Sequence, residues 1–488
     1  MNARARSLSL LLFVACFALA LPARAQTPPA KALIVTPVAE GDEWSPDSIA
    51  ALARDLDALI VGAPALRGAH VGVHVVDTRS GATLYSHAAD DEFQPASTFK
   101  LVVGSAALDK LGPNFRFKTT AYLFHDAVLL RAGGDPFLSA GDLENFAHTL
   151  RAGGIKKIHG LAIDASRYDR LPYAPGWTWD DFAFDYAAKA SAMTLEENVV
   201  HLYLTPGALP GFAAKVTMHP LTLSIGGMAR TLPRGSETTA DVMRDPNGRL
   251  VLTGGIALGT ASHSIDAAVP NPEAYAYAVA LERLRAHGIV LAPPFANPAK
   301  LLRAQIARTV WSHDSLPLAR IMPKFWLPSD NLVGELLLKE LGYATAGGPG
   351  SSANGIAYEK AWMRTLGIDP ATMTLADGCG MSQYDRVTPR DLVTILQHDW
   401  NGPYRSIVLD ALPVGGSRGT IEGIAGTPAA GRVFAKTGSM QHVRGLAGYL
   451  ATERHGAVTF AFNVDDWNGA YADLAGLRAA VLSRIIGD

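Results

Sequence analysis

The sequence predicts an α+β fold in which both ends of the chain contribute to one sheet and a large, mostly β module is inserted between them. Strand-like runs occur near both ends, and each end also carries an amphipathic helix. The middle contains many short strand-like runs with their own turn signals. The 488 residues are 48% hydrophobic and 18% charged, which is typical of a globular protein of two or three domains.

The first elements are a helix and a hairpin. Apolar residues recur at helical spacing over 46–60. Residues 71–76 and 82–85 form two strand-like runs joined at Arg79-Ser80-Gly81. We therefore expect a helix followed by a two-stranded hairpin.

The C-terminal elements are three strands and a closing helix. The strands are predicted over 432–436, 445–452 and 458–464. Residues 470–486 form an amphipathic helix with leucines, alanines, a valine and an isoleucine on one side. We expect these strands to join the N-terminal hairpin in one sheet that helices cover.

The inserted module is predicted over residues 118–270. Its turn signals include Gly133-Gly134-Asp135-Pro136 and Asp245-Pro246-Asn247-Gly248. We expect two small subdomains in this module. Residues 26–117 and 271–488 then form a discontinuous main domain.

The N-terminus has the pattern of a secretory signal peptide. Arg4 and Arg6 precede an apolar run over residues 8–21, and Ala23-Arg24-Ala25 fits a cleavage site. The run is shorter than the ~20 residues that span a bilayer. We therefore expect residues 1–25 to be removed, and the mature protein to cross the inner membrane and reside in the periplasm without an integral membrane segment.

Charge and cysteine content exclude several classes of partner and bond. A net charge of -2 provides no basic field for nucleic acid. Cys16 leaves with the signal peptide, so Cys379 alone remains and no intramolecular disulfide is possible. His70 and His74 are four residues apart on a strand, too far apart to share a metal easily. We expect no metal and no other cofactor.

The first catalytic candidate is Ser97, with Lys100 three residues later. An apolar, helix-like run to residue 111 follows, and positions i and i+3 share a helix face, so the amine can reach the hydroxyl. A serine hydroxyl needs an adjacent base, and a lysine serves if burial or a second cation lowers its pKa. The helix N-terminus adds a field that favours an oxyanion. This motif alone occurs about once by chance in such a chain.

Two further motifs follow in a fixed order. Ser329-Asp330-Asn331 precedes a helix-like run over 332–341, and Lys436-Thr437-Gly438 lies on a predicted strand. The ordered triple is improbable by chance, at about the 10⁻³ level. Ser329 can relay a proton between a lysine and a departing amine, and the Asn331 amide can hold a substrate amide.

The third motif has the chemistry of a carboxylate and backbone site. Lys436 suits a substrate carboxylate and disfavours a charge on Lys100, and Thr437 can bond the same carboxylate. Gly438 lets a substrate backbone approach the strand. The backbone N–H groups of Ser439 and Ser97 are expected to form an oxyanion hole.

With these motifs in place, the chain resembles the low-molecular-mass class C penicillin-binding proteins, which are D-alanyl-D-alanine carboxypeptidases and endopeptidases. The long interval between Ser97 and Ser329 holds two inserted domains in that family and is much shorter in β-lactamases. Further matches are Gly133-Gly134-Asp135-Pro136, Ile163-Asp164, Pro175-Gly176-Trp177, Asp377-Gly378-Cys379-Gly380 and the segment 435–439.

The resemblance implies a serine β-lactamase/penicillin-binding transpeptidase-like fold, with a five-stranded antiparallel sheet and a helical subdomain. It implies an acyl-enzyme on Ser97, peptidoglycan stem peptides and cross-links as substrates, and β-lactam antibiotics as covalent inhibitors. In that family an acidic residue, an arginine and a polar residue hold the free end of the peptide. Asp164 and Gln441 match the first and third, whereas Gln383 stands where arginine is expected. Cys379 replaces a serine, which we interpret as structural.

The sequence also allows other interpretations of the function and of single motifs. A β-lactamase on the same fold would need a deacylating base such as Glu196-Glu197, which we interpret instead as a solvated charge pair. A silent cell-wall-binding scaffold would not need the nucleophile and two lysines. The segment 415–419 matches a G-x-S-x-G elbow but lacks a following Asp and His in order, and we interpret it as a loop near the cleft. For Trp177, Trp179 and Tyr186, packing inside the insert is favoured over stacking on sugar.

Overall fold

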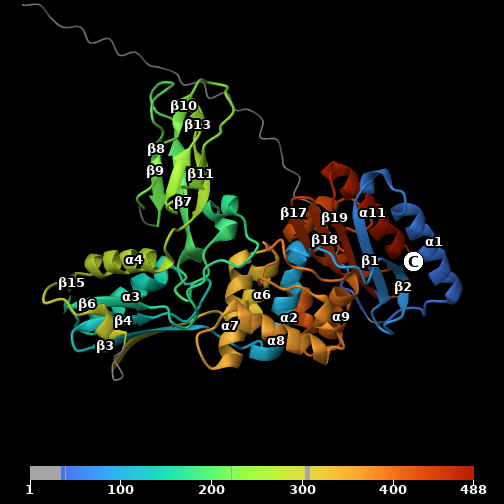
Figure 1. The fold of residues 1–488 in the computed structure, drawn as a ribbon, viewed down its shortest axis with the longest axis horizontal. Helices are drawn as coiled ribbons and strands as arrows, with labels where there is room; N and C mark the ends of the chain where they lie inside the picture. Colours follow the sequence, from blue (N-terminus) through green and yellow to red (C-terminus); the bar gives the residue numbers. More distant parts are fainter. Residues whose placement is uncertain (1–33, 39, 221–222, 303–307, 488) are drawn as a thin grey trace, which may run out of the picture.

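The computed structural model describes residues 34–487 apart from 39, 221–222 and 303–307 (Figure 1). The predicted signal peptide, residues 1–25, and Cys16 lie outside the described residues. Within the described part of the chain, no helix is both long and apolar enough to cross a membrane.

A five-stranded antiparallel sheet joins the two ends of the chain, as predicted. Its strand order is β17-β18-β19-β1-β2, so the C-terminal hairpin pairs directly with β1. The strands are β1 (His70–Asp77), β2 (Thr83–His87), β17 (Val433–Met440), β18 (Val443–Ala451) and β19 (Ala457–Asp465). In this order β17 is an edge strand.

Helices cover both faces of this sheet. On one face, α1 (Pro46–Ile60) and α11 (Tyr471–Ile486) share an apolar core with the strands (Figure 1). The Ser45 hydroxyl caps α1 by accepting the N–H of Ser48, and Pro46 suits the first helical position. On the other face lies a helical subdomain with its own buried cluster. Its helices are α2 (Lys100–Leu111), α6 (Leu318–Trp326), α7 (Asn331–Ala346), α8 (Ser352–Thr365), α9 (Pro389–Asn401) and α10 (Arg405–Ala411).

The inserted strands fall into two groups. The first is a four-stranded sheet of order β16-β3-β4-β6, with three helices against it and a small pair β5-β15. Its elements are β3 (Lys118–Phe124), β4 (Ala127–Arg131), α3 (Ala140–Ala152), β5 (Lys157–Ile158), β6 (Gly160–Asp164), α4 (Pro272–Ala286), β15 (Val290–Leu291), α5 (Pro298–Leu301) and β16 (Arg308–Asp314).

The second group projects away from the first, as Figure 1 shows. It consists of small sheets of orders β14-β7-β8, β11-β12-β9 and β10-β13. Its strands are β7 (Val199–Thr205), β8 (Lys215–His219), β9 (Gly226–Gly227), β10 (Arg230–Leu232), β11 (Asp241–Arg244), β12 (Leu250–Thr253), β13 (Gly255–Ala257) and β14 (His263–Ala268).

The insert extends beyond the predicted boundary at residue 270. Strand β16 pairs antiparallel with β3, and α4 packs on α3, so residues 271–314 belong with the inserted elements. The prediction ended the insert at residue 270, where the stretch of short strand-like runs ends in the sequence. Strand pairing across about 190 residues leaves no local signal in the sequence.

Charged contacts dock the insert onto α7. Arg167 forms an ion pair with Glu340 through two hydrogen bonds of 2.8 and 2.6 Å, and the Tyr168 hydroxyl donates to the same carboxylate. Lys339 donates to Asp169 at 2.5 Å. Because Glu340 and Lys339 are almost fully buried, these bonds fix the insert against the helix that begins at Asn331.

Candidate active site

A strained turn presents Ser97. The residues from Ala96 to Phe99 form a 3-10 turn that continues into α2, and Ala96 has a positive φ of 45°. Such a conformation is uncommon for a residue with a side chain and is frequent at functional sites. Ser97 is half-buried in this turn, at the N-terminal end of α2 as predicted.

Lys100 is fully buried and joins three segments of the chain. Its Nζ donates to Ser97 Oγ at 2.7 Å, to Asn331 Oδ1 at 2.6 Å and to the Cys379 carbonyl at 2.7 Å. All three donors of an ammonium are therefore used. The sequence predicted the contact with Ser97 and the proximity of Asn331, whereas the carbonyl of Cys379 is an additional partner.

The start of α7 positions the second motif. Asp330 caps the helix, because its carboxylate accepts the N–H of Val333. Ser329, just before the cap, has a positive φ of 68°. The Asn331 amide nitrogen donates to the Tyr186 carbonyl at 2.8 Å, so a residue of the insert orients this amide.

Lys436 lies on β17 and is also fully buried. Its Nζ donates to Ser329 Oγ at 2.8 Å and to the Thr437 carbonyl at 2.9 Å. The five predicted catalytic side chains thus form two hydrogen-bonded groups, one of Ser97, Lys100 and Asn331 and one of Ser329 and Lys436.

Burial lowers the pKa of both lysines. For Lys100 desolvation is the main cause, and the nearby Asp377, Asp330 and Glu335 oppose it. Desolvation also holds the pKa of Lys436 well below its usual range, and the charge of Lys100 adds to this effect. A lysine with a lowered pKa can lose a proton near neutrality and act as a base.

Part of the outer edge of β17 is free. Residues 413–415 cover its first half, since Ala435 N donates to the Pro413 carbonyl and Gly415 N donates to the Val433 carbonyl. These bonds place the glycine-rich segment 415–419 beside β17 as a loop, and Thr437 hydrogen-bonds Thr420 at 2.6 Å. The edge from Lys436 to Met440, including Ser439, makes no ladder with another described strand.

Gly438 is required by close packing against the Ser97 turn. A Cβ atom there would lie 2.5 Å from the Pro95 carbonyl oxygen and 3.2 Å from both Ala96 Cβ and Thr98 N. The sequence predicted that this glycine admits a substrate backbone. The structure adds a second reason for a glycine at this position, because β17 packs directly on the turn that carries Ser97.

Asp377 organises the segment that carries Cys379. Its carboxylate accepts the N–H groups of Cys379, Gly380 and Ser382, and also the indole N–H of Trp177 at 2.9 Å. The interpretation of Cys379 as structural fits its complete burial. Trp177 does not pack only within the insert, as was expected, because its indole joins the insert to the main domain.

One group of donor atoms lies within 4.8 Å behind Lys100, formed by Glu335, Asp377 and Cys379. Burial holds the pKa of the Cys379 thiol well above its usual range and raises the pKa of Glu335 to about 8. Protonated groups are poor metal ligands. The absence of a metal therefore stays a prediction that this chemistry favours.

Glu197 keeps the solvent exposure that was predicted for this pair, whereas Glu196 is half-buried. Both have positive φ values, 48° and 54°. The Glu196 carboxylate accepts the N–H of Ala140 at the start of α3. Glu197 hydrogen-bonds the carboxylate of Asp330, and desolvation of its carboxyl group together with that neighbour raises the pKa of Glu197 to about 7. The insert thus places a carboxyl that is protonated below about pH 7 against the cap of α7.

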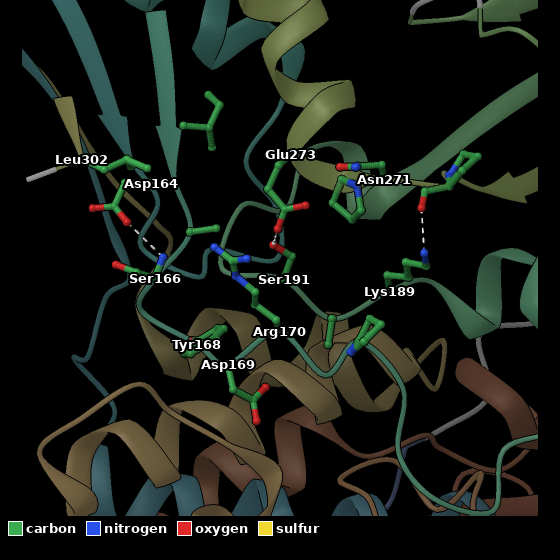
Figure 2. A pocket seen from close by; sticks show the side chains of 16 residues that line it. Asp164, Ser166, Tyr168, Asp169, Arg170, Lys189, Ser191, Asn271, Glu273 and Leu302 are labelled. Carbon is green, nitrogen blue, oxygen red and sulfur yellow. Dashed lines mark hydrogen bonds between the residues drawn. The ribbon is translucent and has the colours of Figure 1, made fainter. Parts of the chain in front are cut away.

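The three predicted peptide-end residues do not lie together. Gln383 and Gln441 line one cavity of about 460 Å³, which also contains Arg386. Asp164 lies elsewhere, at the end of β6 in another cavity, where it pairs with Arg131 at 2.9 Å (Figure 2). The structure thus separates Asp164 from Gln383 and Gln441, and its expected role in peptide binding stays a prediction.

Comparison with known proteins identifies the family of this chain. Residues 52–481 match the family described as D-Ala-D-Ala carboxypeptidase 3 (S13). The chain belongs to this family. A curated S13-like relative, the D-alanyl-D-alanine carboxypeptidase of an Actinomadura species, is 31% identical over 82% of this chain and 78% of its own length.

Two further proteins are similar to this chain. The D-alanyl-D-alanine carboxypeptidase DacB of Haemophilus influenzae is 28% identical over 75% of this chain and 79% of its own length. The crystal structure of penicillin binding protein 4 from the same organism has a TM-score of 0.77 at 24% identity, and covers 88% of this chain and 98% of that one. This similarity shows the fold.

Sequence reasoning singled out Trp177, Tyr186 and Glu197 but did not predict their contacts with the site of this S13 protein. All three reach it from the insert, and Asp377 holds the Cys379 carbonyl in place. The motif Asp377-Gly378-Cys379-Gly380 pointed to the last of these. The contacts of Tyr186 and Glu197 leave no local signal, because both depend on how the insert folds back.

A substitution at Gly438 tests the packing of β17 on the nucleophile turn. We expect Gly438→Ala to push the strand away from Ser97, lowering the unfolding free energy by about 1–3 kcal/mol and slowing acylation by benzylpenicillin at least ~10-fold. Gly476→Ala is the matched control, because a Cβ there meets nothing within 4 Å inside α11. It should keep the acylation rate and gain about 0.5–1 kcal/mol. Normal acylation of Gly438→Ala would contradict the account.

The Glu197–Asp330 contact predicts a pH dependence. The raised pKa means that Glu197 is protonated below about 7 and ionised above it, where two carboxylates face each other beside Asn331. In the unfolded chain this carboxyl ionises at about pH 4.3. Because it stays protonated in the folded protein up to about pH 7, the unfolding free energy falls as the pH rises from about 4.3 to about 7 and then stays level. Glu197→Gln keeps a donor and cannot ionise. Its thermal stability and acylation rate, relative to wild type, should therefore rise between pH 5 and pH 8.

Exposed Glu237 offers the control for this experiment. Glu237→Gln should leave both ratios constant with pH. A Glu197→Gln ratio that is equally flat from pH 5 to pH 8 would show that the two carboxyls do not share a proton.

Proposed function

We propose that this protein is a serine-type D-alanyl-D-alanine peptidase that acts on peptidoglycan peptides through an acyl-enzyme on Ser97. The observation that carries the proposal is the buried Lys100 in contact with both Ser97 and Asn331. Family membership supports the substrate class. Carboxypeptidase and endopeptidase reactions use the same groups and differ only in the leaving amine.

In the acylation step, neutral Lys100 accepts the Ser97 proton while Ser97 Oγ attacks the carbonyl of the penultimate D-alanine. The negative charge that develops on the carbonyl oxygen is stabilised by the N–H groups of Ser97 and Ser439. Breakdown of the tetrahedral intermediate breaks the peptide bond. The departing amine receives a proton from Ser329, which Lys436 and Lys100 can resupply.

In the deacylation step, water attacks the ester on Ser97. Its proton passes to a neutral lysine of the same network, and Ser97 Oγ regains a proton as it leaves. The products are the shortened peptide acid and the free serine. Burial of both lysines supports this scheme, since it favours their neutral forms.

The free edge of β17 is proposed to bind the peptide as an added strand. Backbone groups of residues 436–440 supply the ladder bonds. The Thr437 hydroxyl donates to the terminal carboxylate. Asn331 holds a substrate amide from the other side of the cleft.

The cavity of Gln383 and Gln441 is proposed to receive the free side-chain end of the stem peptide. Gln383 lacks the charge expected there, but Arg386 lies in the same cavity, with its Nη1 donating to the carbonyls of Gln383 and Asp385. Arg386 then supplies the positive charge three residues later in the chain. β-Lactams are proposed as covalent inhibitors, and the periplasm as the location, after removal of residues 1–25.

The acyl-enzyme is tested by mass spectrometry of the purified protein with benzylpenicillin. We expect a stoichiometric mass increase that Ser97→Ala abolishes, because the ester needs the Ser97 hydroxyl. Absence of an adduct on the wild-type chain would refute the proposal and favour a wall-binding scaffold. Loss of the adduct within seconds would indicate a β-lactamase.

The role of Arg386 is tested by peptide kinetics. Arg386→Ala should raise KM about 10-fold or more for a stem peptide with a free side-chain carboxylate, since a charge-assisted hydrogen bond contributes about 1.5–3 kcal/mol. Acylation by benzylpenicillin, which lacks that end, should change less than about 2-fold. Arg54→Ala, at an exposed position on α1, is the control. Equal losses for both substrates would show that Arg386 acts on the fold and not on specificity.

A further inference from the structure

The cavity that contains Asp164 is separate from the Ser97 site. Its volume is about 490 Å³, within the usual range for small-ligand sites. It is formed by the end of β6, the segments 165–172 and 189–191, and the start of α4. Asp169 lines it and pairs with Lys339, which lies eight residues after Asn331 on α7. At 1.5 Å per residue, this anchor is about 12 Å along the helix from Asn331.

Arg170 is the free charge of this cavity. Figure 2 shows its guanidinium between the side chains of Asp164 and Glu273. It forms no hydrogen bond or ion pair with any residue in the described part of the chain. Two acidic residues of the cavity are paired with other cations, Asp164 with Arg131 and Asp169 with Lys339. Arg170 therefore retains its full capacity to bind a carboxylate.

Glu273 supplies the opposite charge. Its Oε1 accepts the hydroxyl of Ser191, which is almost fully buried and so fixes the carboxylate in place. Its Oε2 has no hydrogen-bond partner among the described residues. Lys189 stands farther along the wall with its Nζ bound to the Pro270 carbonyl. The wall of this cavity thus carries an unpaired guanidinium and a carboxylate with one free oxygen.

We propose that this cavity binds the zwitterionic amino-acid end of a second, uncleaved wall peptide, with the carboxylate on Arg170 and the ammonium on Glu273. That the peptide comes from the cell wall rests on the proposed function. Binding there holds a neighbouring stem while Ser97 acts on another, which raises the local substrate concentration through a second attachment.

Other ligand classes fit these charges less well. A bare metal cation would meet the positive charges of Arg170 and Lys189. A polyanion would meet the carboxylates of Glu273 and Asp164. An ammonium and a carboxylate on one carbon match the alternating signs, and the volume accommodates the rest of a short peptide.

The experiment measures peptide binding while the catalytic site is blocked. Protein acylated on Ser97 with benzylpenicillin is titrated calorimetrically with a tetrapeptide that contains diaminopimelate, whose free end carries both charges. We expect saturable binding that Arg170→Ala and Glu273→Gln each weaken at least ~10-fold, from loss of a charge-assisted hydrogen bond. The same peptide acetylated on that ammonium, or amidated on that carboxylate, should lose a similar factor.

The controls separate this site from the fold and from the catalytic centre. Arg249→Ala removes an exposed arginine elsewhere in the insert and should leave binding unchanged. Arg170→Ala should still be acylated by benzylpenicillin at the normal rate, which shows that it folds. The proposal would be overturned if the peptide did not bind, or if its binding did not depend on Arg170. It would also be overturned if free D-alanine bound equally tightly, because the cavity would then be a product site.

The experiments test the proposed function and the inference about this cavity independently. If no adduct forms on Ser97, the serine mechanism is refuted, and the same titration of the Ser97→Ala protein still decides whether the cavity binds the peptide through Arg170. If the adduct forms and the acylated protein binds no peptide, only the inference about this cavity is refuted.

Discussion

The amine of Lys100, which has no solvent contact, is the constraint on which the site depends. A buried polar group is stable only when it is hydrogen-bonded, and a buried charge costs several kcal/mol more, so burial both demands partners for the amine and favours its neutral form. Lys100 has acceptors on three segments: the Ser97 turn, the start of α7 and the Cys379 carbonyl. Each segment must therefore stay in register with the other two. The same burial that demands these partners also makes the lysine a useful base.

The insert takes part in this arrangement. Trp177 bonds the carboxylate that shapes the Cys379 segment, the Tyr186 carbonyl orients Asn331, and Glu197 contacts the cap of α7. These contacts come from a chain segment more than 70 residues after Ser97 and more than 130 before Ser329. The segment between β6 and β7 consequently lines a cavity together with Ser329 and Asn331, and the insert also carries a cavity of its own.

The sequence predicted the main sheet, the helices that cover it and the five catalytic candidates, because periodicity and short ordered motifs are local signals. It misplaced the end of the insert at residue 270, since the pairing of β16 with β3 is long-range. Asp164 was matched by its position in a short motif, and tertiary packing places it in a different cavity from Gln383 and Gln441. The positive φ values of Ala96 and Ser329 were not predictable, because neither residue is a glycine or an asparagine, the types that usually adopt this conformation.

The central claim is that burial makes Lys100 the base that activates Ser97. The most direct test is the pH dependence of the second-order rate constant for acylation of the wild-type protein by benzylpenicillin. The account predicts a rise to a plateau, with a midpoint well below the ordinary lysine pKa of about 10.4. A rate that is still rising at or above that pH would mean that Lys100 stays charged in the working enzyme, and would contradict the account.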